Sequence, residues 1–293
     1  MASRRVDRRL ERASSTAATT SLLSVAGQGG LGIVGFRPIG DVGGAYVTPA
    51  RPHRGYGRCA QRDTNGKWIE ELRVVTHRAD RGYLSWGGGN FEPKSFDEMV
   101  AFLRKGWDTA LGRLLAECAA LGGDGVVGVQ LAEEKMGQDL LQFTALGTAV
   151  RYVGATHLQR PFSTTLSGSD VAKLVGAGYF PAAVVVAMGV GIRHNDYETV
   201  RAKRSFLTNV EVPAHTELLN AAKRAACDDM ARTVAALGGH GAIVDGPLSV
   251  DLLETGCDYA AEVRIIANAL LQFRQRASVG RTDTALDMSA SRK

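Results

Sequence analysis

The chain of 293 residues contains the same short motifs twice, at fixed spacings. A Leu-Ser pair and a Gly-aromatic-x-Pro turn each return 143 residues later (Leu23-Ser24 and Gly35 to Pro38; Leu166-Ser167 and Gly178 to Pro181). The segment 119–125 returns 116 residues later, with His240 in place of Asp124. We interpret this as a tandem duplication with about 27 additional residues inside the first copy. Repeated small units predict an architecture built by repetition and symmetric assembly.

The composition fits two folded domains. With 45% hydrophobic and 22% charged residues, a chain of this length can bury two ordinary cores. From the repeat spacing we predict a first domain over 20–157, with an insertion at about 48–94, and a second domain over 158–273. The two ends, 1–19 and 274–293, are predicted to be disordered basic tails.

The formal net charge of +5 is concentrated at the two ends of the chain. Residues 1–12 and residues 274–293 each carry a net charge of +3, so the part between them is close to neutral. Basic tails of this kind are typical of solvated chain ends, with weak binding to polyanions as the alternative. The charge distribution therefore does not favour nucleic acid as the main partner, and it leaves open a protein partner recruited by the tails.

No segment predicts a membrane span or a leader. The longest apolar stretch, 182–192, contains glycines and lies between Pro181 and Arg193, so it predicts a buried strand. The N-terminus is rich in arginine but lacks the apolar core of a signal peptide, and it contains Asp7 and Glu11. We therefore expect a cytoplasmic protein.

Each copy predicts the same order of elements. Ser167 caps a short helix that ends at Gly178, and an apolar strand over 182–188 follows. Ser95 and Glu98 fit a capping box that begins a long amphipathic helix, and each copy has such a helix ended by a Gly-Gly pair. Strands are predicted after the two long helices (126–129, 143–150, 242–244 and 263–270). The fold class is therefore α+β, with one long helix covering a small, mostly antiparallel sheet in each copy.

The insertion at about 48–94 has no counterpart in the second copy. It contains an Asn65-Gly66 hairpin signal followed by the alternating segment 68–75, and a turn at 87–89. An insertion on a repeated scaffold is a natural place for function, and a decorated surface hairpin without chemistry is the alternative.

Together these motifs resemble the YbjQ family, small bacterial proteins labelled as heavy-metal-binding. The resemblance rests on the Leu-Ser opening, the Gly-aromatic-x-Pro turn, the segment 120–129 and the closing strand 143–150, and it covers most of 20–153 and more weakly 163–273. It implies a compact fold similar to the dodecin subunit, with protomers that close into a ring, typically a pentamer. It implies no established reaction.

The two copies depart from this family pattern in complementary ways. The second copy keeps the opening helix, where the first has the glycine-rich segment 27–32. The first copy keeps the Gly-Val-Val-Gly-Val strand, where the second has 241–245. A site composed of both halves of one unit is therefore not expected to be intact in either copy.

The segment 27–32 matches the dinucleotide fingerprint G-x-G-x-x-G and follows a strand-like segment, 22–25. The fingerprint needs a helix whose N-terminus meets the pyrophosphate, and Gly35 and Pro38 leave room for about one turn. The repeat register instead assigns this segment to a short degenerate helix. Nucleotide binding is therefore not favoured, and we assign no cofactor.

The candidate metal ligands are His53, Cys59 and His77, all in the insertion. A soft metal accepts such ligands, but their spacing matches no compact site, so the metal ligands remain unknown. Cys118 falls on the apolar stripe of the long helix and is predicted to be a core residue. His240 stands where the first copy has Asp124, which favours an exposed position over ligation, and His194-Asn195-Asp196 is typical of a turn.

No catalytic motif is present in the sequence. The carboxylate pairs Glu133-Glu134 and Asp228-Asp229 are interpreted as solvated surface, and nothing matches a zincin, a nucleophile elbow, a P-loop or a carboxylate dyad. We assign no catalytic residue and predict that the protein is not an enzyme.

The leading functional hypothesis is a non-enzymatic, ring-forming homo-oligomeric scaffold or binding protein, whose main partner is itself. The small units with long apolar strands need partners to bury their surfaces, which motivates this hypothesis. The alternatives are a soft-metal-binding or metal-sensing protein that uses the insertion, and a small-molecule binder or enzyme with a site at the subunit interface.

Overall fold

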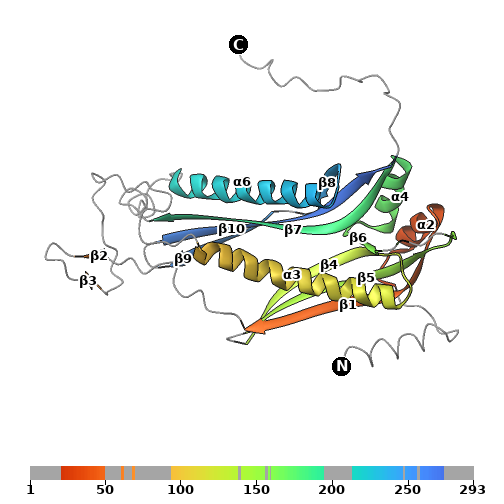
Figure 1. Cartoon of the computed structure of the whole chain (residues 1–293), viewed down its shortest axis with the longest axis horizontal. Coiled ribbons are helices and arrows are strands. Elements are labelled where there is room, and N and C mark those ends of the chain that lie inside the picture. The colour runs from red at the N-terminus through yellow and green to blue at the C-terminus, as the bar shows by residue number, and fades with distance from the viewer. Residues whose placement is uncertain are drawn as a thin grey trace, which may run out of the picture.

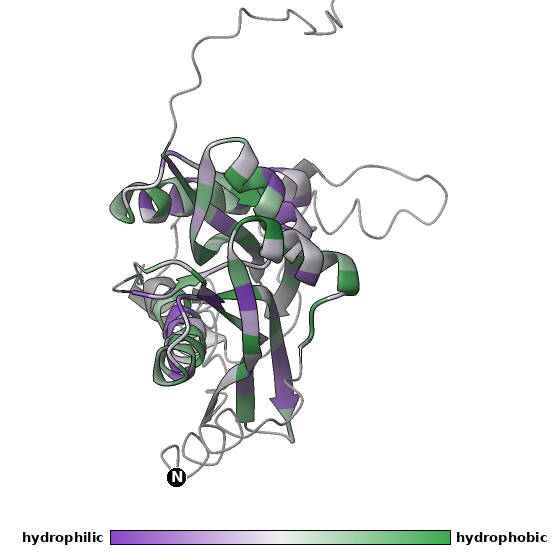
Figure 2. Ribbon diagram, turned by 90° about the vertical axis from the view of Figure 1, so that its right-hand side faces the viewer, coloured by the Kyte–Doolittle hydropathy of each residue, from purple (hydrophilic) through white to green (hydrophobic). Residues whose placement is uncertain are grey.

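A computed structural model describes residues 21–49, 61–62, 68–69, 94–137, 140–155, 158, 160–194, 213–246, 248–255 and 258–273. The same order of elements occurs in both halves: a short helix, a strand, a long helix and then the strands that complete a sheet, two in the first half and three in the second. The α+β class is confirmed. The second half lies above the first in Figure 1 and in the perpendicular view of Figure 2, where hydrophobic residues occur on the ribbons of both halves.

The first half is a four-stranded sheet covered by a long helix. Its strands are β1 (Phe36–Pro49), β5 (Leu140–Tyr152), β4 (Gly125–Met136) and β6 (Phe162–Ser163), in the order β1-β5-β4-β6. The pairs β1–β5 and β4–β5 are antiparallel, whereas β6 pairs in parallel with β4. The covering helix is α3 (Lys94–Ala120), whose start lies one residue before the predicted cap Ser95.

The second half repeats this arrangement with a different third strand. Its sheet contains β7 (Tyr179–His194), β10 (Asp258–Gln272), β8 (Gly241–Val244) and β9 (Ser249–Thr255), and α6 (Pro213–Ala236) covers it. Both β8 and β9 pair antiparallel with β10, on the side that β7 does not occupy. The single strand β4 of the first half therefore corresponds to two shorter strands here.

Glycines allow each long helix to lie directly on its sheet. A Cβ atom on Gly44 of β1 would lie 1.9 Å from the carbonyl oxygen of Ala110 in α3, and one on Gly189 of β7 would lie 2.2 Å from that of Ala222 in α6. Only glycine fits where two backbones approach so closely. The helices thus bury their apolar stripes with little space between helix and sheet.

The two short helices pack against each other. These helices are α2 (Val25–Ile33), capped by Ser24, and α4 (Gly168–Gly176), capped by Ser167, and they begin and end 143 residues apart. A Cβ atom on Gly30 would lie 2.7 Å from the Cα atom of Ser169. The glycine-rich segment therefore serves a close helix–helix contact. The strand-like interpretation of 22–25 was wrong, because Ser24 caps the helix and Val25 is its first residue.

The halves share one core. A single cluster joins Trp107 and Leu111 of α3 and Phe143 of β5 with Val184 and Met188 of β7. The face of the second sheet turned away from α6 thus covers α3 and the neighbouring part of β4. The segment after residue 157, the predicted domain boundary, also reaches back, since β6 joins the first sheet.

Several sequence predictions fall outside the described residues. These are the two tails, most of the insertion, and residues 195–196 of the predicted turn, while His194 ends β7. Within the insertion, β2 (Gln61–Arg62) and β3 (Trp68–Ile69) pair antiparallel on either side of the predicted Asn65-Gly66 hairpin. Among the described residues, no helix is long and apolar enough to cross a membrane.

The contact between the short helices generates a prediction. Gly30→Ala should lower the free energy of unfolding by about 2 kcal/mol, because the added methyl group meets the α4 backbone. Gly29→Ala in the same helix is the matched control, since nothing lies within 4 Å of its Cβ position. That control should be neutral or stabilising by up to about 1 kcal/mol through helix propensity. Urea unfolding of both variants is the measurement, and equal effects would contradict the packing.

Candidate functional site

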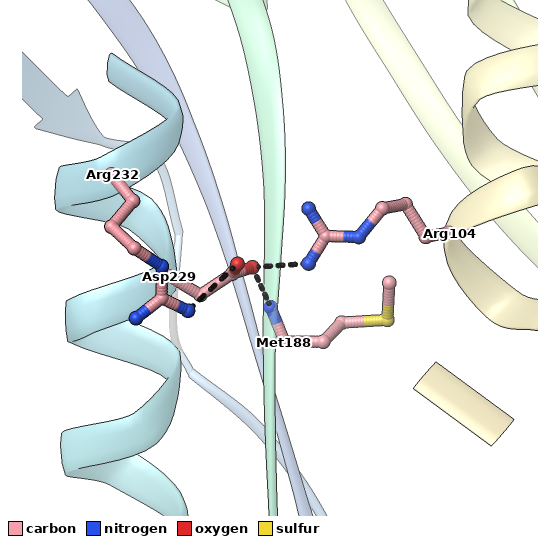
Figure 3. A network of polar contacts seen from close by, with 4 residues as sticks. All are labelled: Arg104, Met188, Asp229 and Arg232. Atoms are coloured by element: carbon pink, nitrogen blue, oxygen red, sulfur yellow. Dashed lines mark hydrogen bonds and ion pairs between the residues drawn. The ribbon is translucent and has the colours of Figure 1, made fainter. Parts of the chain in front are cut away.

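A network of polar contacts between the two halves is centred on Asp229 of α6 (Figure 3). The Asp229 carboxylate accepts a hydrogen bond from Nη2 of Arg104 in α3 at 2.7 Å and from the backbone N–H of Met188 in β7 at 3.1 Å. Arg232, one turn along α6, approaches its other oxygen at 3.4 Å. Asp229 is only 6% exposed, so this carboxylate joins three elements from inside the protein.

This position explains why a charged residue is tolerated in the interior. A buried carboxylate is stable only when its oxygens are paired and hydrogen-bonded, and here a guanidinium and a backbone amide supply both. Met188 lies on β7, the edge strand of the second sheet, so its N–H group is available to a side chain. The interpretation of Asp228-Asp229 as solvated surface was therefore wrong for Asp229, whereas Asp228 is exposed.

A second charged group lies in the interface between the two halves, where β4 of the first half faces β10 of the second. Arg264 of β10 forms an ion pair and a hydrogen bond with Glu133 of β4. Its guanidinium carbon also lies 5.6 Å from the ring centroid of Trp107, which is 2% exposed. A cation above an aromatic face and beside a carboxylate is held from two sides. Glu133 of the first half thus pairs with Arg264 of the second half. Its interpretation as solvated surface was therefore also wrong.

Glu262 of β10 stands two residues before Arg264 and has a perturbed ionisation. Burial raises the pKa of this carboxyl from 4.5 to about 7. The Arg264 guanidinium lowers the pKa, while the negative charges of Glu133 and Asp251 raise it. The surroundings of Glu262 therefore favour its protonated form.

A third, uncharged group attaches the segment between the halves to the second sheet. Asn268 of β10 is fully buried, and its Oδ1 accepts hydrogen bonds from the Thr164 hydroxyl at 2.9 Å and the Thr165 N–H at 2.8 Å. Its Nδ2 donates to Thr165 Oγ1 at 2.8 Å. In the first half, Thr148 Oγ1 similarly accepts from the Leu22 N–H at 3.1 Å. The segment preceding each short helix is therefore held on its own sheet in the same way.

The predicted metal ligands are not brought together by the described structure. His53, Cys59 and His77 lie outside the described residues, as does Cys257. Among the residues that are described, no group of three His, Cys, Asp or Glu side chains could hold a metal ion. Cys227 is exposed on α6.

Cys118 is a core residue, as predicted. It is fully buried, and its Sγ donates to the Gly125 carbonyl oxygen at 3.3 Å. Burial raises the pKa of its thiol to about 12, so the thiolate required for metal binding is strongly disfavoured.

In the turn after each long helix, one side chain accepts hydrogen bonds from backbone N–H groups of other segments. The sequence did not reveal this role. Asp124 is 2% exposed, and its carboxylate accepts the N–H groups of Tyr152 at 2.8 Å and Leu158 at 2.9 Å. His240 is exposed, and its Nδ1 accepts the N–H of Gln272 at 3.2 Å. The expectation that this shared position is exposed is therefore met by His240 and was wrong for Asp124. Both side chains accept from the last part of the closing strand, which explains why the position tolerates either residue.

Comparison with known proteins supports the sequence resemblance for part of the chain. Residues 86–153 match the YbjQ family. The family is described as "Putative heavy-metal-binding", and the match includes α3, β4 and β5 of the first half. The YbjQ resemblance stated from the motifs is thereby confirmed over these residues.

A relative with a longer region of similarity is the "Encapsulin nanocompartment protein Rv1762c" of Mycobacterium tuberculosis (strain ATCC 25618 / H37Rv). The two sequences are 37% identical over 125 residues, which is 40% of this chain and 47% of the relative. The chain therefore matches about half the length of that protein.

The Asp229 site predicts a large effect of a single substitution. Asp229→Ala should lower the free energy of unfolding by about 3 kcal/mol, because Arg104 loses its buried partner and the Met188 N–H loses its acceptor. Asp228→Ala, at the exposed neighbour, should change it by less than about 0.5 kcal/mol. Urea unfolding followed by circular dichroism compares the two. Similar losses would contradict the role of the Asp229 network.

Glu262 predicts a dependence of stability on pH. Because its pKa is raised in the folded protein, the protonated form is favoured by folding, so its stabilising effect falls as pH rises from about 4.5 to about 7. Glu262→Gln should therefore be more stable than the parent by about 2 kcal/mol at pH 8, allowing for partial solvent exposure, and similar to it near pH 4. Glu134→Gln, at an exposed neighbour of Glu133, is the control. Parallel pH profiles of thermal stability for the parent and Glu262→Gln would refute the assignment.

Proposed function

We propose that this protein is a non-enzymatic, homo-oligomeric scaffold that assembles through repeated YbjQ-like units. The observation that carries this proposal is the core shared by the two halves, in which Val184 and Met188 of one sheet complete the core beneath α3. A unit of this design buries one face of its sheet with its own helix and the other face against a neighbouring unit. Two units in one chain satisfy only one such contact.

On this proposal the two halves are duplicated copies of one YbjQ-like unit with a dodecin-like fold. Three structural correspondences support this: the short helices begin and end 143 residues apart, the long helices both end at a Gly-Gly pair, and the closing strands are bound by Asp124 and His240 at matching positions. Repeated units joined by one kind of contact close into a ring when the rotation between them permits it. Five chains would then present ten similar units, as the resemblance implies.

The relative supports a role within a larger protein assembly. Because that protein is named as a nanocompartment protein and is 37% identical over the shared region, we propose that this chain also works as part of a protein compartment. The exposed large hydrophobic side chains support association with other protein surfaces. Among them are Val47 and Leu146 in the first half and Val250 and Leu252 in the second.

The proposal is tested by native mass spectrometry of the untagged full chain, with light scattering at about 10 µM. We expect a discrete multiple of the 31.1 kDa chain mass, because the exposed apolar surfaces of one copy are covered by another. A mass equal to one chain would overturn the proposal.

The second candidate is a soft-metal-binding protein, which the description of the matching family favours. Its ligands would be His53, Cys59 and His77 of the insertion. The same spectrum separates the two, since a bound metal adds mass in a simple ratio to the chains. Loss of that mass in a variant with all three residues changed to Ala would favour metal binding over a purely structural role.

A further inference from the structure

Two surfaces contact each other inside the chain and are buried there. Each of them has an equivalent surface on the other half, and that equivalent is exposed. The buried pair consists of the outer face of the second sheet, turned away from α6, and the flank of α3, formed by that helix and β4. The outer face contributes Val184, Met188 and Ile266, and the flank contributes Trp107, Leu111 and Leu131. The exposed pair is the outer face of the first sheet and the flank of α6, whose residues follow from the strand registers.

The outer face of the first sheet corresponds in position to the buried outer face of the second. Thr148 and Asn268 bind the segments before the short helices in the same way, so Leu146 and Ile266, two residues earlier in each strand, are equivalent. Ile266 packs into the shared core, whereas Leu146 is 44% exposed. Around Leu146 the described residues leave open a face on three strands, on which apolar side chains (Ala45, Val47, Ala132 and Leu140) alternate with polar ones (Gln130, Glu134, Gln142 and Thr144).

The flank of α6 corresponds to the buried flank of α3. Phe143 pairs with Glu133 in the first sheet and Val263 pairs with Val250 in the second, and both Phe143 and Val263 are buried beneath their long helix. Val250 therefore stands where Glu133 contacts the second half. The flank of α6 is an exposed apolar strip beside this helix (Val244, Leu248, Val250 and Leu252, with exposed fractions of 39–48%).

The helices show the same difference. Trp107 and Leu111 of α3 are buried against the second half, and the residues 116 positions later in α6, Lys223 and Cys227, are exposed. The strand edge differs likewise, because β6 pairs with β4, whereas β8 has no partner on its outer edge among the described residues. Each half thus leaves open the surface that the other half has buried.

From this correspondence we propose that a second copy of this chain docks the outer face of its first sheet onto the flank of α6. The contact is head-to-tail, because each copy offers a different surface to each neighbour, and it repeats the contact already present between the halves. This inference rests on the proposed self-association and assigns the surfaces that produce it. The occupant is a second copy because the internal contact shows which surface fits the flank.

The junction between chains differs from the internal one at the short helices. Within the chain, Gly30 and Gly168 permit close packing of α2 and α4. The residues at the corresponding positions in a junction between copies are Lys173 and Val25. Their side chains prevent an equally close approach, so the junction between copies is wider at this end. This difference distinguishes the two kinds of contact.

The test uses one charge on each surface of the full-length chain. Leu146→Asp disables the outer face of the first sheet, and Val250→Asp disables the flank of α6. Both side chains are more than 40% exposed, so both variants should fold, which circular dichroism and thermal unfolding check. Ile33→Asp is the control, since Ile33 is 84% exposed on α2 and belongs to neither surface.

We expect each variant alone to fall from the parent's oligomeric mass to the mass of one chain, while Ile33→Asp keeps the parent's mass. An equimolar mixture of the two variants should give twice the mass of one chain, because the intact flank of the first variant fits the intact outer face of the second. This rescue is specific to a head-to-tail contact.

Other results overturn the inference in distinguishable ways. A parent protein with the mass of one chain removes the proposed self-association and the docking with it. An oligomeric parent whose two variants keep its mass leaves self-association standing and refutes these surfaces. Variants that dissociate alone and remain single chains when mixed refute the head-to-tail pairing.

Discussion

The structure depends on the contact between the second sheet and α3. Each sheet has one face covered by its own long helix, and the opposite face of the second sheet is covered by the first half of the chain. Burial of Val184 and Met188 against Trp107 and Phe143 is driven by removal of apolar surface from water. Without this contact the strand β7, apolar on both faces, would expose one face to solvent. The two halves therefore share one core.

Charged and polar groups fix how the two halves sit on each other. Apolar packing alone tolerates sliding, whereas the pairing of Asp229 with Arg104 and of Glu133 with Arg264 has defined geometry. Buried pairs of this kind add little net stability, because desolvation offsets their attraction, but losing one partner is costly. The third group, Asn268 with Thr164 and Thr165, attaches the connecting segment to the second sheet. The network therefore defines one register for the contact.

The differences between the halves are as informative as their similarity. The first half has the continuous strand β4 and the glycine-rich helix α2, and the second has the divided strands β8 and β9 and the bulkier helix α4. Gly30 and Gly168 lie where α2 meets α4 inside the chain. The equivalent positions, 143 residues away, carry the larger side chains of Lys173 and Val25. Glycine thus allows the close packing of α2 and α4 that joins the two halves at this end.

The sequence by itself determined the order of the main elements in both halves, although it did not predict the strands β6 and β9. Periodicity of apolar residues located α3, α6 and the strands β4, β5, β7, β8 and β10, because helix and strand periods are local properties of the chain. The motifs also identified the YbjQ resemblance over 86–153 and placed Cys118 in the core. Ser167 and Gly178 marked the ends of α4 because capping depends on a few neighbouring residues.

Only the tertiary structure decided which surfaces meet. Asp229 and Glu133 look like solvated carboxylates in sequence, because their partners Arg104 and Arg264 lie more than 100 residues away and are brought close by stacking of the halves. The glycines of α2 predict a weak helix by propensity, and contact with α4 explains both the helix and its composition. Local patterns set each element, whereas long-range contacts set burial, and burial determines which charges are paired, which glycines lie in close contacts and which faces stay exposed.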